Sequence, residues 1–588
     1  MCGINGYVGR NNPVREMNAA LLHRGPDYQG TYDDQGVHLG HCLLSIRGEP
    51  LASHQPYTKS GSPWVLIFKG QVYNTKQLSR DFSIPLQDLD TAMIFDLIEK
   101  IGWDFIHHIH GMFGIALYNK DEKIVRLYRD DAGQKPLYYS KTHDGVVFSS
   151  ELKGLQSAGI RFEPDTYSTT IAGALGYIPG DRTLFSNVRK LDAGETVTIH
   201  TDGRIEQAYR PLSQKSHLTG TSSEVLTQTV QEHLQSKQKV ALNLSGGMDS
   251  SLLLHEMKAA GHTMTTYTTS FEGAGESFND DAVIACQLAK EYGTNHTEII
   301  ITKDIYQKNF IESYERLEEP NYNISLPTYL EVAKREGVSG DGNRVILSGN
   351  GGDEVFGGYP YYGKSLAYTK QIGRITPQLF NVWKWARTGN YWRYQKPVER
   401  WLAFKYFDFM GMPTAQKEVS LYIETIAEKR GLVFGDPVRD MMLLDRTIWL
   451  PGESFMQADK IYMGESLEMR APLAYQPLRA YFDAKLNTHD YIANGGNKEY
   501  LRRLYKGKLP DYVVERKAKT GWRSPVRPWY DSEMKKLFLQ ILSEAPRGGI
   551  VRWDHIQKEV ASKDTWPGKY VFLYLSLAIL SKKYNVAL

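Results

Sequence analysis

The sequence predicts two unlike domains. The first is an α+β domain built from stacked antiparallel sheets, and the second is an α/β domain with a parallel sheet and a helical C-terminal region. Short strand-like segments separated by turn residues fill the first two hundred residues, a pattern typical of antiparallel sheets. Beyond them, short apolar strands alternate with helical segments, which indicates a parallel sheet. The length of 588 residues also exceeds what one hydrophobic core usually organises.

In the first domain, expected to span residues 1–208, several segments have the composition of strands. They are residues 4–9, 36–46, 63–74, 112–119, 124–130 and 145–150. Residues 91–102 instead carry apolar side chains at helical spacing. Residues 209–223, which contain a polar stretch, interrupt the pattern and are the predicted linker.

The second domain, residues 224–588, begins with apolar strands at 239–244, 265–271 and 344–347. From about residue 363 the chain is mainly helical and rich in aromatic side chains, which we expect to lie in the core. Among them are Trp383, Trp385, Trp392 and Trp401. The longest apolar stretch, residues 571–580, is shorter than the roughly 18 residues that a membrane span needs, so it is predicted to be a buried helix.

The composition is that of an ordinary globular enzyme, with 41% hydrophobic and 23% charged residues. A formal net charge of +3 offers no electrostatic reason to expect nucleic acid or a membrane as partner. Cys2, Cys42 and Cys286 are too few and too irregularly spaced for a disulfide framework or a zinc site. The N-terminus has no secretory pattern, and we expect a cytoplasmic protein.

Two glycine-rich loops predict a nucleotide site. The first follows a strand and opens a helix, so its backbone N–H groups and the helix N-terminus would face a phosphate. The second follows another strand, and adjacent parallel strands would bring the loops together. The expected ATP-binding residues are Ser245, Gly246, Gly247, Asp249, Ser250, Ser251, Ser348, Gly349 and Gly351. Asp249 and Asp353 are the expected Mg²⁺ ligands, because a carboxylate beside phosphates needs a bridging cation.

Two further segments carry candidate catalytic groups. Cys2 follows Met1, and removal of Met1 would leave a thiol whose own α-amine could serve as its base. Lys519, in the basic segment 516–522, is expected to neutralise charge in the transition state of pyrophosphate release. The alternative for this segment is a solvated basic face, and the alternative for Cys2 is an incidental thiol.

The motifs together resemble asparagine synthetase over nearly the whole chain. Ser245–Ser251 (SGGMDSS) looks like the signature loop of pyrophosphatase-loop ATP enzymes. The remaining motifs follow in the order of that family: Cys2-Gly3-Ile4, residues 22–27, 129–139, 347–359, 466–472 and 516–522. The resemblance implies a class II glutamine amidotransferase domain of the Ntn type, which releases ammonia through a cysteinyl thioester into an internal tunnel. It also implies an adenylating domain that activates a carboxylate, aspartate in that family, with ATP and Mg²⁺. The implied partners are a small-molecule or peptide carboxylate and glutamine, ammonia or an amine, with a homodimer as the candidate assembly.

The glutamine pocket departs from the family pattern. The arginine that holds the glutamine α-carboxylate falls on Leu43, the oxyanion-hole asparagine on Lys69, and an acidic partner of the α-amine on Gln71. Gly70 and Asp90 still match substrate-binding positions. An oxyanion donor is worth about 3 kcal/mol in related enzymes, so glutamine hydrolysis is expected to be slow, redirected or absent.

The adenylating site departs as well, since Asn350 replaces a glutamate and Tyr475 replaces an aspartate. Three functions therefore remain open. The first is a glutamine-dependent amidotransferase. The second is an amide-forming synthetase or cyclase that uses a substrate amine, as in the β-lactam synthetases and lasso-peptide cyclases. The third, a regulatory nucleotide-binding protein, is disfavoured by Asp249, Asp353 and Lys519.

Overall fold

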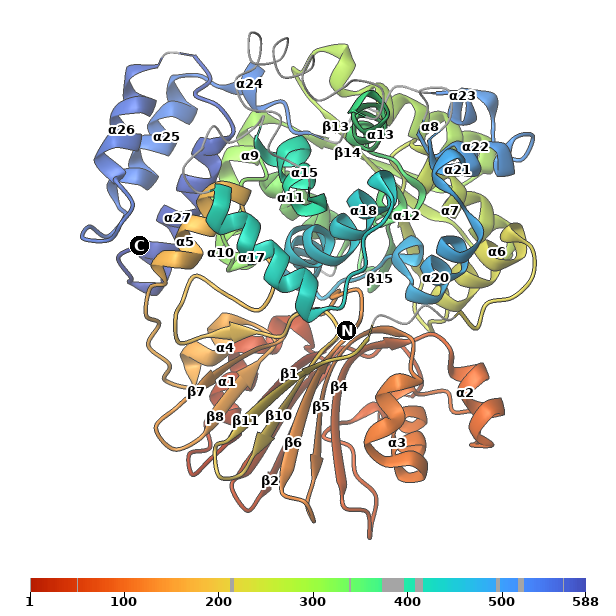
Figure 1. Ribbon diagram of the computed structural model, residues 1–588, viewed down its shortest axis with the longest axis vertical. Coiled ribbons are helices and arrows are strands. Elements are labelled where there is room, and N and C mark those ends of the chain that lie inside the picture. The colour runs from red at the N-terminus through yellow and green to blue at the C-terminus, as the bar shows by residue number, and fades with distance from the viewer. Residues whose placement is uncertain are drawn as a thin grey trace.

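The computed structural model describes residues 2–49, 51–211, 216–337, 340–372, 396–407, 416–492, 497–516, 523–563 and 565–588. The N-terminal sheets and the helices beside them form the lower body in Figure 1, and most of the remaining chain forms the upper body. The N-terminus lies at the junction of the two bodies. The predicted order, α+β followed by α/β, is confirmed.

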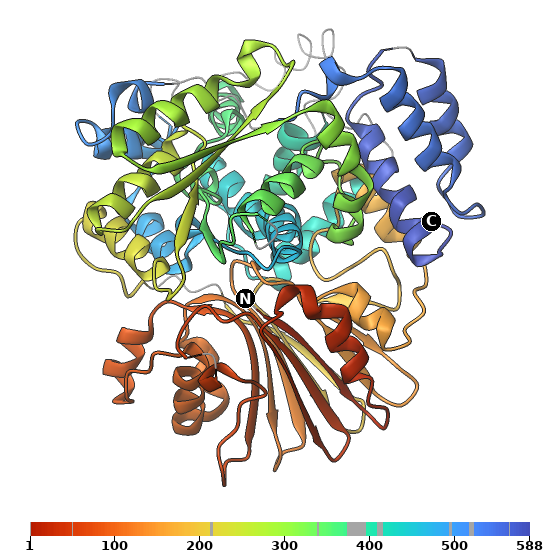
Figure 2. The same cartoon turned by 180° about the vertical axis from the view of Figure 1, so that it is seen from behind.

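Two antiparallel sheets pack face to face in the N-terminal body (Figure 2). The first has the order β2-β3-β1-β8-β7-β9 and contains β1 (Gly3–Val8), β2 (Tyr28–Asp34), β3 (Val37–Leu43), β7 (Tyr138–Lys141), β8 (Val146–Ser149) and β9 (Arg189–Lys190). The second has the order β11-β10-β6-β5-β4 and contains β4 (Trp64–Val72), β5 (Gly111–Asn119), β6 (Ile124–Arg129), β10 (Glu195–His200) and β11 (Ile205–Tyr209). Side chains of both sheets, including Ile4, Leu39 and Ile67, fill the space between them.

Helices cover the outer faces of this sandwich. Helices α1 (Val14–Leu21) and α4 (Leu152–Ser157) lie on the first sheet, and α3 (Asp90–Ile101) lies on the second. The helix expected at residues 91–102 is therefore confirmed within one residue. The expected segments did not include β2, β7, β9, β10 and β11. Strands β2 and β11 are polar and partly exposed, so they lack the alternation of apolar and polar residues that marks a strand.

The C-terminal body is organised around a parallel sheet of order β14-β13-β12-β15-β16. Its strands are β12 (Val240–Asn243), β13 (Thr265–Phe271), β14 (Asn295–Ile301), β15 (Val345–Leu347) and β16 (Glu468–Arg470). Val240 and Leu242 point into one core and Ala241 into the other, so the sheet is buried on both faces.

The C-terminal helices complete the two cores. Helix α27 (Tyr570–Tyr584) contains the apolar stretch 571–580 and is mostly buried, as predicted. Trp401 is fully buried, whereas Trp383, Trp385 and Trp392 lie outside the described residues. Within the described parts of the chain, no helix combines the length and apolar character required to cross a membrane.

A buried arginine joins the two bodies. The Arg24 guanidinium donates to Glu151 Oε1 at 2.6 Å and to Asp459 Oδ2 at 2.8 Å, and none of the three side chains is exposed by more than 1%. Glu151 belongs to the first body, and Asp459 lies on helix α19 (Phe455–Met463) of the second. Burial alone would raise the pKa of Asp459, but Arg24 and Lys135 outweigh it and lower that pKa to about 2.

We predict that Arg24→Met strongly destabilises the junction, because Glu151 and Asp459 lose the cation they share. Glu151 then keeps only its partners within its own domain, such as Lys153, and Asp459 keeps only the longer contact with Lys135 at 3.4 Å. Breaking a buried pair in this way costs about 3–5 kcal/mol. Denaturant unfolding monitored by fluorescence measures the change. The control is Arg204→Met, which removes an exposed partner of Glu206 and should leave the unfolding midpoint unchanged. Equal midpoints for the two variants would contradict this account of the junction.

Candidate active site

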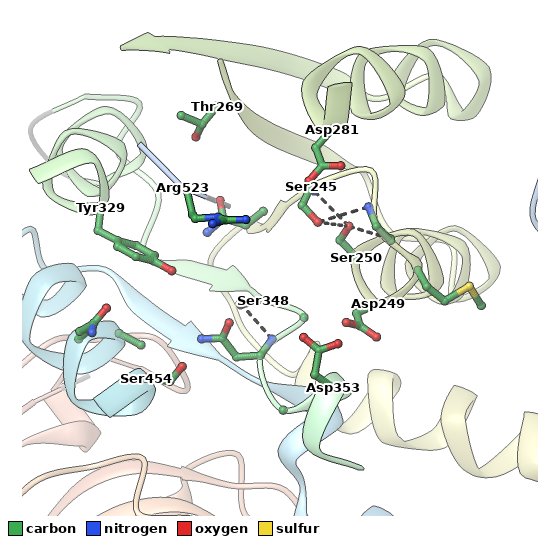
Figure 3. Close-up of a pocket in the computed structure, with 18 of the residues that line it drawn as sticks. Ser245, Asp249, Ser250, Thr269, Asp281, Tyr329, Ser348, Asp353, Ser454 and Arg523 are labelled. Atoms are coloured by element: carbon green, nitrogen blue, oxygen red, sulfur yellow. Dashed lines mark hydrogen bonds between the residues drawn. The ribbon is translucent and has the colours of Figure 1, made fainter. Parts of the chain in front are cut away.

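A cavity of about 520 Å³ lies at the carboxyl edge of the parallel sheet, between the loops that follow β12 and β15. The two strands pair in parallel, with Leu242 opposite Leu347, so both loops leave the sheet at the same edge. The sequence-based expectation that these loops meet is confirmed. Figure 3 shows Ser245 and Ser250 from one loop region near Asp249, with Ser348 and Asp353 from the other.

The first loop is shaped as a phosphate cradle. Gly246 has a φ of +71°, and a Cβ there would lie 2.6 Å from the Asp281 carbonyl oxygen, so only glycine fits. The Ser245 and Ser250 hydroxyls are 3.0 Å apart. Helix α7 (Met248–Ala259) starts here with no side-chain cap, which leaves its first N–H groups directed at the cavity.

The predicted residues of this loop do not all reach the cavity. Ser245, Gly246, Gly247, Asp249 and Ser250 line it. Ser251 is different, because its side chain is fully buried on α7 and it is not among the described residues that line the cavity.

The second loop approaches the first closely because its glycines have no side chain. A Cβ on Gly349 would lie 2.9 Å from Asp249 Cβ, and one on Gly352 would lie 2.5 Å from Asp249 Cγ. Ser348, Gly349 and Gly351, the predicted residues of this loop, all line the cavity. Asn350 lines it too.

Lys498 links the two loops. Its Nζ lies 2.6 Å from Asp353 Oδ1 and also forms an ion pair with Asp249. Burial would lower the pKa of Lys498, but the two carboxylates outweigh it and raise that pKa. Sequence reasoning missed this residue because it belongs to none of the motifs. Its local sequence shows only that Asn497 and Lys498 directly precede helix α22 (Glu499–Tyr505), which does not indicate a contact with either loop.

The Asp249–Lys498–Asp353 cluster also shows how a divalent cation would fit. Two carboxylates that already converge on one positive charge suit Mg²⁺, which is usually held by one or two carboxylates plus phosphate oxygens and water. No group of three or more His, Cys, Asp or Glu side chains within the described residues could hold a metal by itself. Asp249 and Asp353 could therefore hold a cation if a bound nucleotide supplied further ligands.

Other cations lie farther along the cavity. Arg516 pairs with Asp281 at 2.6 Å, and Arg523 and Lys569 line the wall. Burial and the nearby Arg523 lower the pKa of Lys569 to about 8. Lys519, the expected catalytic lysine, lies outside the described residues.

Cys2 borders a second, smaller pocket of about 50 Å³ at the junction of the two bodies. Its side chain is 6% exposed, and burial raises the pKa of the thiol. Gly70 and Asp90, the two expected substrate-binding residues, line the same pocket, so the structure brings all three together. The apolar Leu43 also lines it.

Leu43, Lys69 and Gln71, the three positions that depart from the family pattern, have different surroundings in the structure. Arg47 enters the pocket and forms an ion pair with Asp90, so a guanidinium is present although Leu43 cannot provide one. Lys69 is fully buried, and its Nζ donates to the Pro136 carbonyl. It is not among the described residues that line the pocket, so its side chain does not supply an oxyanion donor there. Gln71 accepts a hydrogen bond from Arg470 at 3.1 Å.

Strand β16 separates the two pockets. Glu468 lines the Cys2 pocket, and the next residue, Met469, lines the nucleotide cavity. This follows from the strand geometry, in which successive side chains point to opposite faces. Tyr475 lies in the junction as well, with its ring 5.5 Å from that of Tyr73 and 5.2 Å from that of His233. It is not among the described residues that line the nucleotide cavity, so of the two departures in the second domain only Asn350 lies there.

Comparisons with known proteins find relatives along most of the chain. Asparagine synthetase 1 (glutamine-hydrolysing) of Bacillus subtilis is 26% identical over 605 residues, covering 95% of this chain and 92% of the relative. Asparagine synthetase 3 of the same organism is 25% identical, covering 92% of this chain and 90% of the relative. Asparagine synthetase 2 of Oryza sativa is 28% identical over 401 residues, which cover 62% of this chain and 61% of the relative.

Family models divide the chain in the same order as the two bodies. A model described as a glutamine amidotransferase domain matches residues 1–210. A model described as asparagine synthase matches residues 221–576, more than half of the chain. The resemblance expected from the motifs is confirmed. The chain belongs to the asparagine synthase family and carries a glutamine amidotransferase domain at its N-terminus.

Proposed function

We propose that this protein is an ATP-dependent carbon–nitrogen ligase that activates a carboxylate as an acyl-adenylate, releases pyrophosphate and forms an amide. The convergence of the two glycine loops on the Asp249–Lys498–Asp353 cluster is the observation that carries this proposal. We assign the adenylation to residues 224–588 and the supply of nitrogen to residues 1–208, with residues 209–223 as the linker.

The loops and α7 would bind the departing pyrophosphate. Backbone N–H groups of the first loop and the positive end of the α7 dipole favour a phosphate anion at this position. Lys498 supplies a full positive charge close to it. When bound, Mg²⁺ would be held by Asp249 and Asp353 and would neutralise phosphate charge. Adenylation is needed because a free carboxylate is a poor electrophile, whereas AMP is a good leaving group.

The Cys2 pocket supports glutamine as one nitrogen source. Arg47 and Asp90 present opposite charges in one pocket, and these match the α-carboxylate and α-amine of an amino acid. Gly70 retains a backbone N–H for an oxyanion. The oxyanion donor expected at residue 69 is missing, because Lys69 is directed at Pro136. We therefore propose a slow glutaminase, with ammonium or a substrate amine as the better donor.

The two nitrogen sources lead to different products. With glutamine or ammonia the product is a primary amide, as the names of the Bacillus relatives imply for aspartate. With a substrate amine the product is a secondary amide or a ring. Asn350 in the cavity favours a carboxylate other than aspartate, since the family glutamate is replaced there.

We predict that Asp249→Ala and Lys498→Met each reduce carboxylate-dependent pyrophosphate release by at least about 100-fold, because each removes charge balance at the phosphates. A coupled pyrophosphate assay measures the rate. Lys485→Met is the matched control, since Lys485 is exposed on helix α20 (Gln476–Lys485) and should behave as wild type. Pyrophosphate release at the wild-type rate in Asp249→Ala or Lys498→Met would refute this assignment of the phosphate site.

We predict that Arg47→Met raises the KM for glutamine by about 10- to 100-fold and leaves ammonium-dependent synthesis unchanged. The reason is that a charge-assisted hydrogen bond to the α-carboxylate is worth about 1.5–3 kcal/mol. Glutamate release and amide formation are measured side by side, with Cys2→Ala as the reference without a nucleophile. An unaltered KM would exclude Arg47 as the carboxylate partner.

The same assay also compares ammonium with glutamine as the nitrogen source of the wild-type protein. Wild-type protein should form amide faster with saturating ammonium than with saturating glutamine, because one oxyanion donor is missing. Efficient, Cys2-dependent glutamate release that matches amide formation would show that the pocket is fully competent and that our interpretation of Lys69 is wrong.

A further inference from the structure

Glu453 is a buried acid in the wall of the nucleotide cavity that no motif identified. It lies near the end of η7 (Asp445–Ser454), directly before helix α19, and only 5% of it is exposed. Ser454 and Gln457 line the cavity beside it. A buried carboxylic acid in a substrate cavity requires an explanation, because burying its charge is costly.

The other carboxylates that line the cavity already have specific neighbours. Asp249 and Asp353 bind Lys498, Asp281 binds Arg516, and Glu354 accepts the Tyr359 hydroxyl beside Asp353. These groups therefore belong to the phosphate end or to its supports. Glu453 instead accepts a hydrogen bond from the neutral Gln457 amide.

A short hydrogen-bond chain orients Glu453. The Asn323 side-chain amide donates to Gln457 Oε1 at 2.9 Å, which directs the Gln457 Nε2 group toward Glu453 Oε1. Burial raises the pKa of Glu453 to about 7, although the Gln457 amide, the charge of Lys405 and a hydrogen bond with Asn321 oppose this shift. A carboxylate that titrates near neutral pH is well suited to accept a proton from a substrate.

The position of Glu453 also faces the nitrogen source. Its neighbours touch the amidotransferase domain, since Arg129 of that domain donates to the Pro451 carbonyl at 3.5 Å and a Cβ on Gly452 would lie 2.8 Å from the Tyr177 ring. In Figure 3, Ser454 lies at the side of the pocket nearest to the N-terminal domain, whose ribbon is drawn in faint orange at the bottom. Glu453 therefore lies on a wall of the cavity that is close to the amidotransferase domain.

We propose that Glu453 is the general base of the amide-forming step. It accepts a proton from the attacking nitrogen while the new C–N bond forms at the carbonyl carbon of the acyl-adenylate. The C–O bond to the adenylate then breaks, and AMP leaves with the electron pair. This role rests on the proposed adenylating function. It assigns to Glu453 the proton transfer that Asn350, a neutral amide, cannot perform.

The test separates adenylation from amide formation. L-Aspartate and a panel of other amino acids and dicarboxylic acids are screened by ATP/pyrophosphate exchange, and the most active acid is used thereafter. Glu453→Gln should exchange pyrophosphate within about 3-fold of wild type, yet form amide from ammonium about 100- to 1,000-fold more slowly, because general bases contribute about 10²- to 10⁴-fold. Glu453→Asp should recover part of the loss. Glu424→Gln, on helix α17 (Gln416–Lys429), is the control and should match wild type in both assays.

Two further readouts distinguish a base from a structural residue. Hydroxylamine, which is largely unprotonated at neutral pH, should restore product formation by Glu453→Gln to within about 10-fold of wild type. The wild-type rate, corrected for free ammonia, should fall as the pH drops through about 7, and this inflection should vanish in Glu453→Gln.

The results that would contradict the role of Glu453 differ from those that would contradict the adenylating function. Equal losses of exchange and amide formation, or the absence of rescue by hydroxylamine, would overturn the role of Glu453 and leave the adenylating function standing. If wild-type protein shows no exchange with any acid of the panel, the proposed function is wrong and this inference falls with it.

Discussion

The contacts of Arg470 hold the two pockets in one arrangement. This fully buried side chain donates to Glu468 at 2.7 Å, to the His233 and Gln235 carbonyls at 2.6 and 2.9 Å, and to Gln71 of the other domain at 3.1 Å. A buried guanidinium with so many acceptors is costly to displace. It therefore fixes strand β16, whose neighbouring residues Glu468 and Met469 form walls of different pockets. Because one three-residue strand serves both pockets, a shift of the domain junction would alter both together.

Within the nucleotide cavity, charge balance explains the close approach of the two loops. Asp249 and Asp353 would repel each other without a cation between them, and Lys498 provides it. The glycines then permit a backbone separation that any side chain would prevent. The Cys2 pocket follows the same logic with different residues, since Arg47 now balances Asp90 from a position four residues after Leu43. The pocket therefore contains a guanidinium although Leu43 is apolar.

Much of this arrangement could be predicted because it is local in sequence. Strand, glycine loop and helix occur together around Ser245 and again around Ser348, so the meeting of the two loops at one cavity followed from spacing and from the pairing of parallel strands. Cys2, Gly70 and Asp90 could be placed by the family motifs. Lys498 and Glu453 could not, because their roles depend on contacts with residues far away in the chain. Arg24 and Asp459, 435 residues apart, illustrate the same limit. The direction of a side chain could not be predicted from the sequence either. Lys69 points at the Pro136 carbonyl, and Arg47 points at Asp90.

The acyl-adenylate is the central chemical claim, and an oxygen-isotope experiment tests it most directly. Carboxylate substrate labelled with ¹⁸O in both carboxyl oxygens is converted with ATP and ammonium, and the nucleotide product is analysed by mass spectrometry. If the carboxylate attacks the α-phosphorus, one ¹⁸O atom appears in AMP and none in pyrophosphate. Unlabelled AMP, or formation of ADP with labelled phosphate, would contradict the account.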